Sequence, residues 1–306
     1  MTDLTIHMQD YLRLRRALGY KLGLEAYGLP QLVAYLGTVG APVLTVEHAL
    51  SWVRLPQDLT AKTLENRLAA VRGFAKYLQT IDPATEVPPR GVFGPRQPRP
   101  APYLWSDEEI RRLLAAARQI QPPLTAATLE ALLGLLAVTG MRLGEALCLE
   151  HHDIDLVEGV LTIREAKFDR PRLVPVHPSV STALQAYASR RDQLCPKPSS
   201  ETFFITADGA TVTGANTRYL FKKITTSIGM RTTTVRPRIH DLRHSFAVRT
   251  LTGWHRSGIN VSGRMAVLST YLGHINPAGT YWYLSATPEL MGLAAARLDN
   301  RFGGGR

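Results

Sequence analysis

The chain has 306 residues, of which 45% are hydrophobic and 20% are charged, and this is ordinary for a globular protein with room for two domains. Its 36 Lys and Arg residues outnumber 25 Asp and Glu residues, giving a net charge of +11 that favours a polyanionic partner such as nucleic acid, although ribosomal and membrane-surface proteins share this balance. The two cysteines are isolated, which argues against a disulfide scaffold and a zinc site. The sequence has no apolar signal core and no apolar run long enough to span a bilayer, which argues against a membrane protein. We therefore expect a cytoplasmic, nucleoid-associated chain.

Residues 1–82 predict a domain of short helices. Amphipathic patterns cover residues 4–18, 25–39, 45–53 and 60–79. In the last helix, apolar residues recur on one stripe while basic residues occupy the rest, among them Lys62, Arg67 and Arg72. This basic face either contacts DNA or is simply solvated, and the pattern favours neither interpretation.

Residues 83–103 predict a semi-extended linker. Repeated prolines remove backbone donors and prevent helix formation. After Glu86 its only charges are Arg90, Arg96 and Arg99. These arginines suit a strap along a phosphate backbone, and a plain interdomain connection fits equally well.

Residues 104–306 predict a second domain, mainly helical with a small β-hairpin. Ser106 and the acidic residues after it predict a capped helix, and a long apolar helix over 124–138 stops at Thr139-Gly140. Residues 160–164 and 172–176 predict the two strands of the hairpin. Further short extended pieces are expected at 203–205 and 211–212, and helices from residue 216 onward.

Two segments of this domain carry arginines suited to phosphate. Arg142 stands at the start of a helix, where free N–H groups and the helix dipole favour an anion, although an ordinary pair with Glu145 is the alternative. His240 and Arg243 share a helix face, and the chain around them is rich in arginine, including Arg236 and Arg238. This local density indicates phosphate.

A metal site is not expected on this helix. His240 and His244 have the spacing of a zincin pair, but the glutamate that acts as base in that motif is missing and no third ligand is marked. We therefore predict a structural role for His244.

Four segments together resemble the tyrosine recombinase (phage integrase) family across about 140 residues of the second domain. They are TGMRLGEALCL (139–149), REAKFDRPRLVPV (164–176), RPRIHDLRHSFA (236–247) and YLGHINPAGTYWYL (271–284). The resemblance implies six catalytic residues, namely Arg142, Lys167, His240, Arg243, His274 and Tyr283, with Glu145 in a supporting role.

Two of these assignments depend on local detail. The turn around Lys167 lacks the usual glycines, so its alignment rests on the RLVPV run that follows. Tyr281 and Tyr283 both lie in the nucleophile segment and point about 200° apart on a helix, so only one of them can face the phosphate. The family's nucleophile is expected nine residues after His274, which favours Tyr283.

The family chemistry needs neither metal nor nucleotide. In the family, tyrosine attacks a DNA phosphate, and the arginines and His274 stabilise the developing charge. His240 is the candidate base for the tyrosine, and Lys167 is the acid for the departing 5′-hydroxyl. The 3′-phosphotyrosine keeps the bond energy, so no cofactor is required, and the sequence contains no Walker motif. The resemblance also implies a helical, SAM-like core-binding domain at the N-terminus.

The expected partner is double-stranded DNA, bound by four copies of the chain, with related recombinases as further partners. The C-terminal segment from residue 288 docks either on a neighbouring copy or on its own domain. Two other functions stay open: a type IB topoisomerase-like relaxase, which uses similar chemistry without a specific sequence, and a DNA-binding protein without catalysis. The leading expectation is a site-specific recombinase or integrase of a mobile element.

Overall fold

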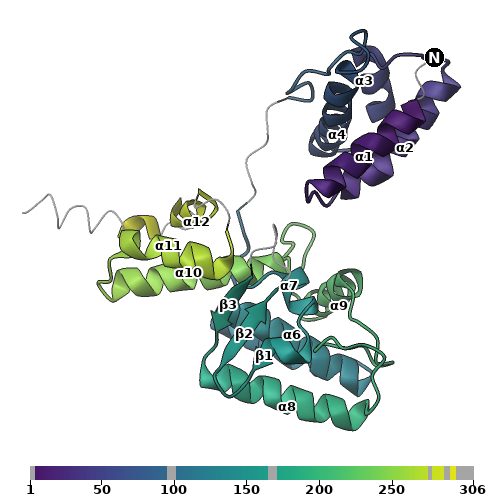
Figure 1. Ribbon diagram of the computed structural model, residues 1–306. Coiled ribbons are helices and arrows are strands. Elements are labelled where there is room, and N and C mark those ends of the chain that lie inside the picture. Colours follow the sequence, from purple (N-terminus) through teal and green to yellow (C-terminus); the bar gives the residue numbers. More distant parts are fainter. Residues whose placement is uncertain (1–3, 95–100, 165–170, 275–277, 286–289, 294–306) are drawn as a thin grey trace, which may run out of the picture. The chain divides into compact units, whose positions relative to one another are not determined.

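A computed structural model describes residues 4–94, 101–164, 171–274, 278–285 and 290–293, with the side chains of residues 278, 284 and 285 left undescribed. The chain divides into two compact units, Met1–Pro100 and Ala101–Arg306, which are taken in turn (Figure 1). Within the described ranges, no helix is both long enough and apolar enough to cross a lipid bilayer.

The first unit is a four-helix assembly, and all four helices were predicted. The helices are α1 (Leu4–Ala17), α2 (Gly23–Thr38), α3 (Val46–Arg54) and α4 (Ala61–Gln79). Thr45 and Thr60 cap the last two, each accepting a hydrogen bond from a backbone N–H three residues on. Their apolar stripes meet in one core, where Leu29, Leu68 and Phe74 are fully buried.

Part of the predicted linker belongs to this unit. Val87, Val92 and Phe93 pack against the helical core. Arg72 donates to the carbonyl oxygens of Pro88 (2.8 Å) and Pro89 (2.7 Å). Extended proline-rich chain leaves its carbonyls without intrachain partners, and this arginine supplies donors to two of them. The segment 83–94 is therefore anchored on the first unit instead of being free.

The second unit begins with a helical layer. Its helices are α5 (Asp107–Ala117), α6 (Pro123–Thr139), α7 (Leu143–Leu147), α8 (Pro178–Leu194) and α9 (Gly214–Ser227). Ser106 and Glu109 form the capping box predicted for α5. Helix α8 was not predicted; it packs along α6 and buries a narrow stripe of Leu184, Tyr187 and Arg191.

The sheet is a three-stranded antiparallel meander that follows a short 3-10 turn, η1 (His151–Asp153). Strand β1 (Ile154–Asp155) pairs with β2 (Val160–Ile163), which pairs in turn with β3 (Arg172–Pro175). The β2–β3 register places Leu161 opposite Val174, both buried. This pair forms the predicted hairpin, and its connecting residues 165–170, which include Lys167, lie outside the described residues.

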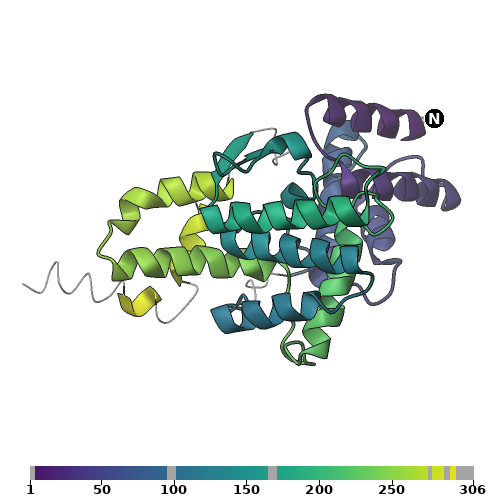
Figure 2. The same cartoon turned by 90° about the horizontal axis from the view of Figure 1, so that it is seen from below.

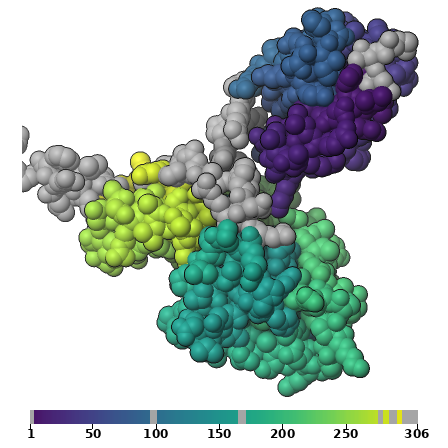
Figure 3. Space-filling model, in the orientation of Figure 1, coloured from purple at the N-terminus to yellow at the C-terminus, as the bar shows by residue number. Residues whose placement is uncertain are grey.

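The second unit has two apolar cores: α6 and the sheet contribute to the first, and the remaining helices form the second. They are α10 (His240–Arg256), α11 (Val261–Leu272), α12 (Ala278–Tyr281) and the 3-10 turn η2 (Trp282–Ser285). Helix α10 belongs to both cores, since Leu242 packs with α6 whereas Leu251 packs with α11. Figures 1 and 2 show α10 and α11 side by side, and in Figure 3 they form a lobe extending from the rest of the unit. The N-terminal turns of α10 therefore lie where the two cores meet.

Candidate active site

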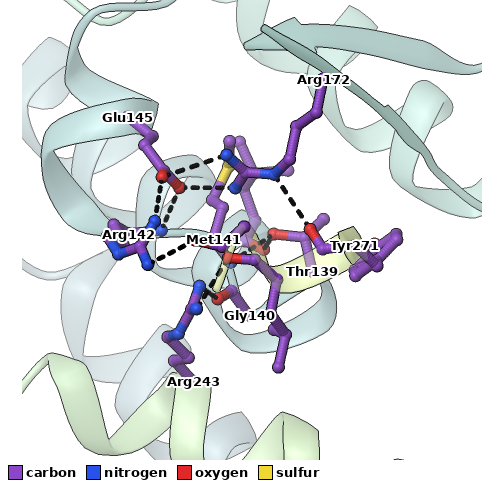
Figure 4. Close-up of polar contacts among 11 residues, drawn as sticks. Thr139, Gly140, Met141, Arg142, Glu145, Arg172, Arg243 and Tyr271 are labelled. Atoms are coloured by element: carbon purple, nitrogen blue, oxygen red, sulfur yellow. Dashed lines mark hydrogen bonds and ion pairs between the residues drawn. The ribbon is translucent and has the colours of Figure 1, made fainter. Parts of the chain in front are cut away.

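Arg142 is held at the N-terminus of α7 by two different partners. Its guanidinium donates to Glu145 (2.6 Å) and to the carbonyl oxygen of Gly273 (2.8 Å), at the end of α11 (Figure 4). Its backbone N–H also donates to Glu145, at 2.8 Å. The predicted pair with Glu145 therefore exists. Because 29% of the Arg142 side chain stays exposed, the pair positions the arginine without closing it off from a ligand.

Glu145 is shared with a second arginine that sequence reasoning missed. Arg172, the first residue of β3, donates to Glu145 through two nitrogens (2.7 and 3.1 Å) and to the carbonyl oxygen of Tyr271 (3.0 Å). Burial alone raises the pKa of Glu145, but the hydrogen bonds from Arg172 and Arg142 outweigh it, so the pKa is lowered. Glu145 and the two arginines that it binds therefore hold the hairpin, α7 and the end of α11 together.

Arg243 is buried and is held by backbone carbonyls. It lies on the first turn of α10, is 2% exposed, and donates to Gly140 (2.8 Å) and Leu272 (2.7 Å). Burial and the nearby charge of Arg142 lower its pKa to about 10, so it remains cationic at neutral pH. The motif histidine-x-x-arginine marks this residue in the sequence, but the pattern gives no sign of what holds it.

The carbonyls that hold both arginines lie at two helix ends. Gly140 ends α6 with φ +62° and Gly273 ends α11 with φ +67°, a left-handed conformation that glycine adopts without strain. Helix C-termini carry partial negative charge, which favours a nearby cation. The convergence of α6 and α11 therefore accounts for the position of Arg142 and Arg243.

Tyr283 is enclosed by histidines from two elements. It is 2% exposed, and its hydroxyl lies 3.2 Å from Nδ1 of His244. The His274 ring stacks on the Tyr283 ring with centroids 6.1 Å apart, and Nδ1 of His274 lies 2.6 Å from the Thr280 hydroxyl. Tyr281, by contrast, is 52% exposed. Of the two tyrosines left open by the sequence, only Tyr283 is enclosed within this cluster.

The histidines of the cluster are neutral at physiological pH. His240 meets His244 edge to face, with ring centroids 4.7 Å apart. Burial, followed by the charge of Arg243, lowers the pKa of both His240 and His274 to about 4. Each neutral ring offers one donor and one acceptor nitrogen.

A basic hollow of about 500 Å³ adjoins the cluster, next to α7. Its lining includes five cationic or titratable side chains: Arg142, Arg218, Arg231, Arg238 and His240. Arg238 is anchored by the buried Asp241 (2.7 Å) yet keeps half of its side chain exposed. Sequence reasoning proposed Arg238 as a DNA contact but did not single out Arg218, which lies on α9 and distant in sequence. In the described part of the chain, no group of three or more His, Cys, Asp or Glu residues is placed to hold a metal ion.

The structure thus brings together five of the six predicted catalytic residues, while Lys167 lies outside the described residues. The predicted DNA contacts are scattered. Lys62 and Arg236 are exposed, and Arg96 and Arg99 fall outside the described residues. The guanidinium of Arg67 stacks 4.1 Å from the Trp52 ring, so this arginine and Arg72 have structural contacts within the first unit. A DNA-binding role for these side chains stays a prediction.

Known proteins with similar sequences cover nearly the whole chain. The sequence profile of the Phage integrase family matches residues 105–289. Integrase/recombinase y4rB of Sinorhizobium fredii is 39% identical over 303 residues, spanning 96% of this chain and 96% of that protein. Tyrosine recombinase XerC of Rhizobium meliloti is 30% identical over 242 residues, spanning 78% and 69% of the two chains.

Solved structures share the fold at lower sequence identity. The Tn1549 transposon integrase in complex with transposon right end DNA superposes with a TM-score of 0.68 at 18% identity, covering 95% of this chain and 99% of that one. XerH site-specific recombinase bound to difH substrate gives a TM-score of 0.67 at 19% identity, covering 90% and 79%. The fold and the family profile together define a DNA-recombining enzyme of the tyrosine class. The chain belongs to the phage integrase family.

Proposed function

We propose that this chain is a site-specific DNA recombinase of a mobile element, which cuts and rejoins DNA through a 3′-phosphotyrosine at Tyr283. One observation carries the proposal: the enclosed Tyr283 hydroxyl lies in the same cluster as Arg243 and the histidines His244 and His274. The names of its relatives support this reading, since XerH is described as bound to its difH substrate and the Tn1549 integrase as bound to transposon end DNA.

The cations of the site suit phosphoryl transfer. The pentacoordinate phosphorus gains charge on its non-bridging oxygens, and preorganised donors stabilise that charge without reorganising. Arg142 and Arg243 supply guanidinium groups already fixed by helix-end carbonyls, and His274 supplies a further ring N–H. Loss of one such donor typically lowers the rate by about 10²–10³-fold.

The bond that forms and the bond that breaks are both phosphodiesters. The Tyr283 oxygen attacks phosphorus, the bond to the 5′-oxygen breaks, and the leaving oxygen takes a proton. Lys167 remains our proposal for this acid, from the family pattern alone. Attack by a 5′-hydroxyl on the phosphotyrosine reverses the step, so rejoining needs no nucleotide.

The rest of the chain fits a DNA clamp. In this proposal residues 1–82 form the core-binding domain, residues 83–103 the linker and residues 104–306 the catalytic domain with its C-terminal helix. Four copies act on two DNA sites in the cytoplasm, alone or with related recombinases.

The test is capture of a covalent adduct. The full chain is incubated in EDTA with DNA of the organism that encodes it, and SDS-resistant complexes are isolated to identify the site. A nicked duplex of that site then traps cleavage, because its short 5′-hydroxyl fragment diffuses away. We expect an adduct with the natural chain, none with Tyr283→Phe, and retention with the matched Tyr281→Phe.

Three outcomes would replace the proposal. An adduct that survives Tyr283→Phe would move the nucleophile elsewhere. Relaxation of supercoiled plasmids lacking the captured site would favour a topoisomerase-like enzyme, and DNA binding without any adduct would favour a protein without catalysis.

A further inference from the structure

The nucleophile's hydroxyl contacts a histidine outside the six residues implied by the family pattern. Nδ1 of His244 lies 3.2 Å from the Tyr283 oxygen, and the ring centroids are 5.5 Å apart. His244 lies one turn after His240 on α10, and Tyr283 reaches it from η2. The sequence suggested a structural role for His244, and this contact with the hydroxyl points to a further one.

Neighbouring rings fix the orientation of this imidazole. Trp282 packs on it with centroids 5.4 Å apart, and His240 meets it edge to face at 4.7 Å. With Tyr283, three rings therefore pack on this imidazole, which restricts its freedom to turn Nδ1 away from the hydroxyl. Such preorganisation is what a group engaged in proton transfer requires.

The surroundings of His244 keep it neutral. Burial, followed by the neighbouring His240 and the guanidiniums of Arg238 and Arg243, lowers its pKa to about 4 against the opposing charge of Asp241. A neutral imidazole has one acceptor nitrogen. With the ring proton on Nε2, Nδ1 is free to accept from the phenol.

We propose that His244 is a catalytic residue, and that its Nδ1 takes the hydroxyl proton of Tyr283 as the phenol oxygen attacks the DNA phosphate. The O–H bond of Tyr283 breaks and an N–H bond forms on His244. An O–P bond forms, the P–O5′ bond breaks, and the 5′-oxygen takes its proton from the acid of the site. On rejoining, the imidazolium returns the proton to the departing phenolate.

The position of His240 supports this division of labour. His240 lines the basic hollow with Arg142 and Arg238, whereas His244 and Tyr283 do not line it. It is therefore suited to donate to phosphate oxygens, whereas His244 makes the 3.2 Å contact with the nucleophile's hydroxyl. The proposal rests on Tyr283 being the nucleophile of the proposed function.

The test measures single-turnover adduct formation by the full chain on two nicked duplexes. One carries the natural oxygen at the scissile phosphate, and the other a 5′-bridging sulfur, which departs without an acid. The variants are His244→Phe, His244→Asn and His244→Gln, since asparagine places its amide near the position of Nδ1 and glutamine near that of Nε2. His151→Asn is the matched control, because His151 belongs to the same unit and packs on Phe203.

We expect His244→Phe to slow cleavage by about 10²–10⁴-fold on both duplexes. His244→Asn should keep more activity than His244→Gln. With the sulfur duplex, the rate of the natural chain should level off above the pKa of the base. The rate of His244→Phe should continue to rise toward the phenol's ordinary pKa of about 10.

Several results would overturn the assignment. If His244→Phe cleaves both duplexes at the natural rate while Tyr283→Phe forms no adduct, His244 has no catalytic role and the proposed function still stands. If His244→Phe is slow on the oxygen duplex but reaches the natural rate on the sulfur duplex, His244 acts on the leaving group instead of on the tyrosine. If His244→Phe is unfolded at the assay temperature, the other two variants decide. Equal cleavage rates for His244→Asn and His244→Gln would count against the proposal. No adduct with the natural chain would instead remove the proposed function itself.

Discussion

Glu145→Gln removes the negative charge that Arg142 and Arg172 share. Glu145 is 5% exposed and accepts from Arg142 and Arg172 at 2.6, 2.7, 2.8 and 3.1 Å. Glutamine keeps the volume but has one acceptor oxygen, and its amide would face guanidinium donors. Breaking a buried ion pair by removing one partner costs about 3–5 kcal/mol. Because glutamine preserves part of the hydrogen bonding, we expect about 3 kcal/mol.

Thermal unfolding followed by circular dichroism measures this loss. In a domain of this size, 1 kcal/mol shifts Tm by about 2–4 °C, so Glu145→Gln should lower Tm by roughly 6–12 °C. The matched control is Glu108→Gln, whose pair with Arg111 is exposed on both sides and is worth at most about 1 kcal/mol.

The pH dependence gives an independent check on the same residue. Since folding lowers the pKa of Glu145 below its ordinary value of 4.5, the unfolded chain binds the proton more readily. The stabilisation is therefore complete above about pH 4.5 and is lost as pH falls through the folded pKa. The Tm gap between the natural chain and Glu145→Gln should close on acidification. A gap below 2 °C at pH 7, or one that stays constant into acid, would refute the reasoning.

Two further substitutions test neighbouring contacts. Arg172→Lys cannot keep both bonds to Glu145 and the bond to Tyr271, so adduct formation should fall about tenfold or more, whereas the exposed Arg111→Lys should leave it unchanged. Gly140→Ala adds a Cβ 2.5 Å from the Phe246 ring at a φ of +62°. The matched control is Gly229→Ala, where the φ is also positive (+73°) but no atom lies within 4 Å of the added Cβ. The urea midpoint of unfolding should fall by more for Gly140→Ala than for this control.

Local signals predicted the elements well where the chain itself determines them. Thr45, Thr60 and Ser106 mark helix starts that the structure reproduces, because a side-chain cap depends on residues only three apart. Helix α8 escaped prediction because its buried stripe is narrow and most of its residues are polar. Its stability comes from packing on α6, which the sequence of α8 does not show.

The site residues divide in a similar way. Motif spacing identified residues that the structure brings together, such as Arg243, because the family chemistry requires those residue types. The same spacing missed Arg172 and His244, since their partners lie 27 and 39 residues away and the contacts depend on how α10, β3 and η2 pack together. Tertiary contacts of this kind leave no periodic trace in a sequence.

The manner in which the arginines are held explains why the site favours an anion. A carboxylate beside each guanidinium would cancel its charge. Among the described contacts of Arg142, Arg172 and Arg243, only Glu145 takes that part, shared between Arg142 and Arg172. Arg243 is balanced by the ends of α6 and α11, whose carbonyls carry partial charges. Burial of this cation is unfavourable, and it lowers the pKa of Arg243. In the proposed function, a DNA phosphate would supply the full negative charge that these helix ends lack, and its binding would offset the cost of burying this cation.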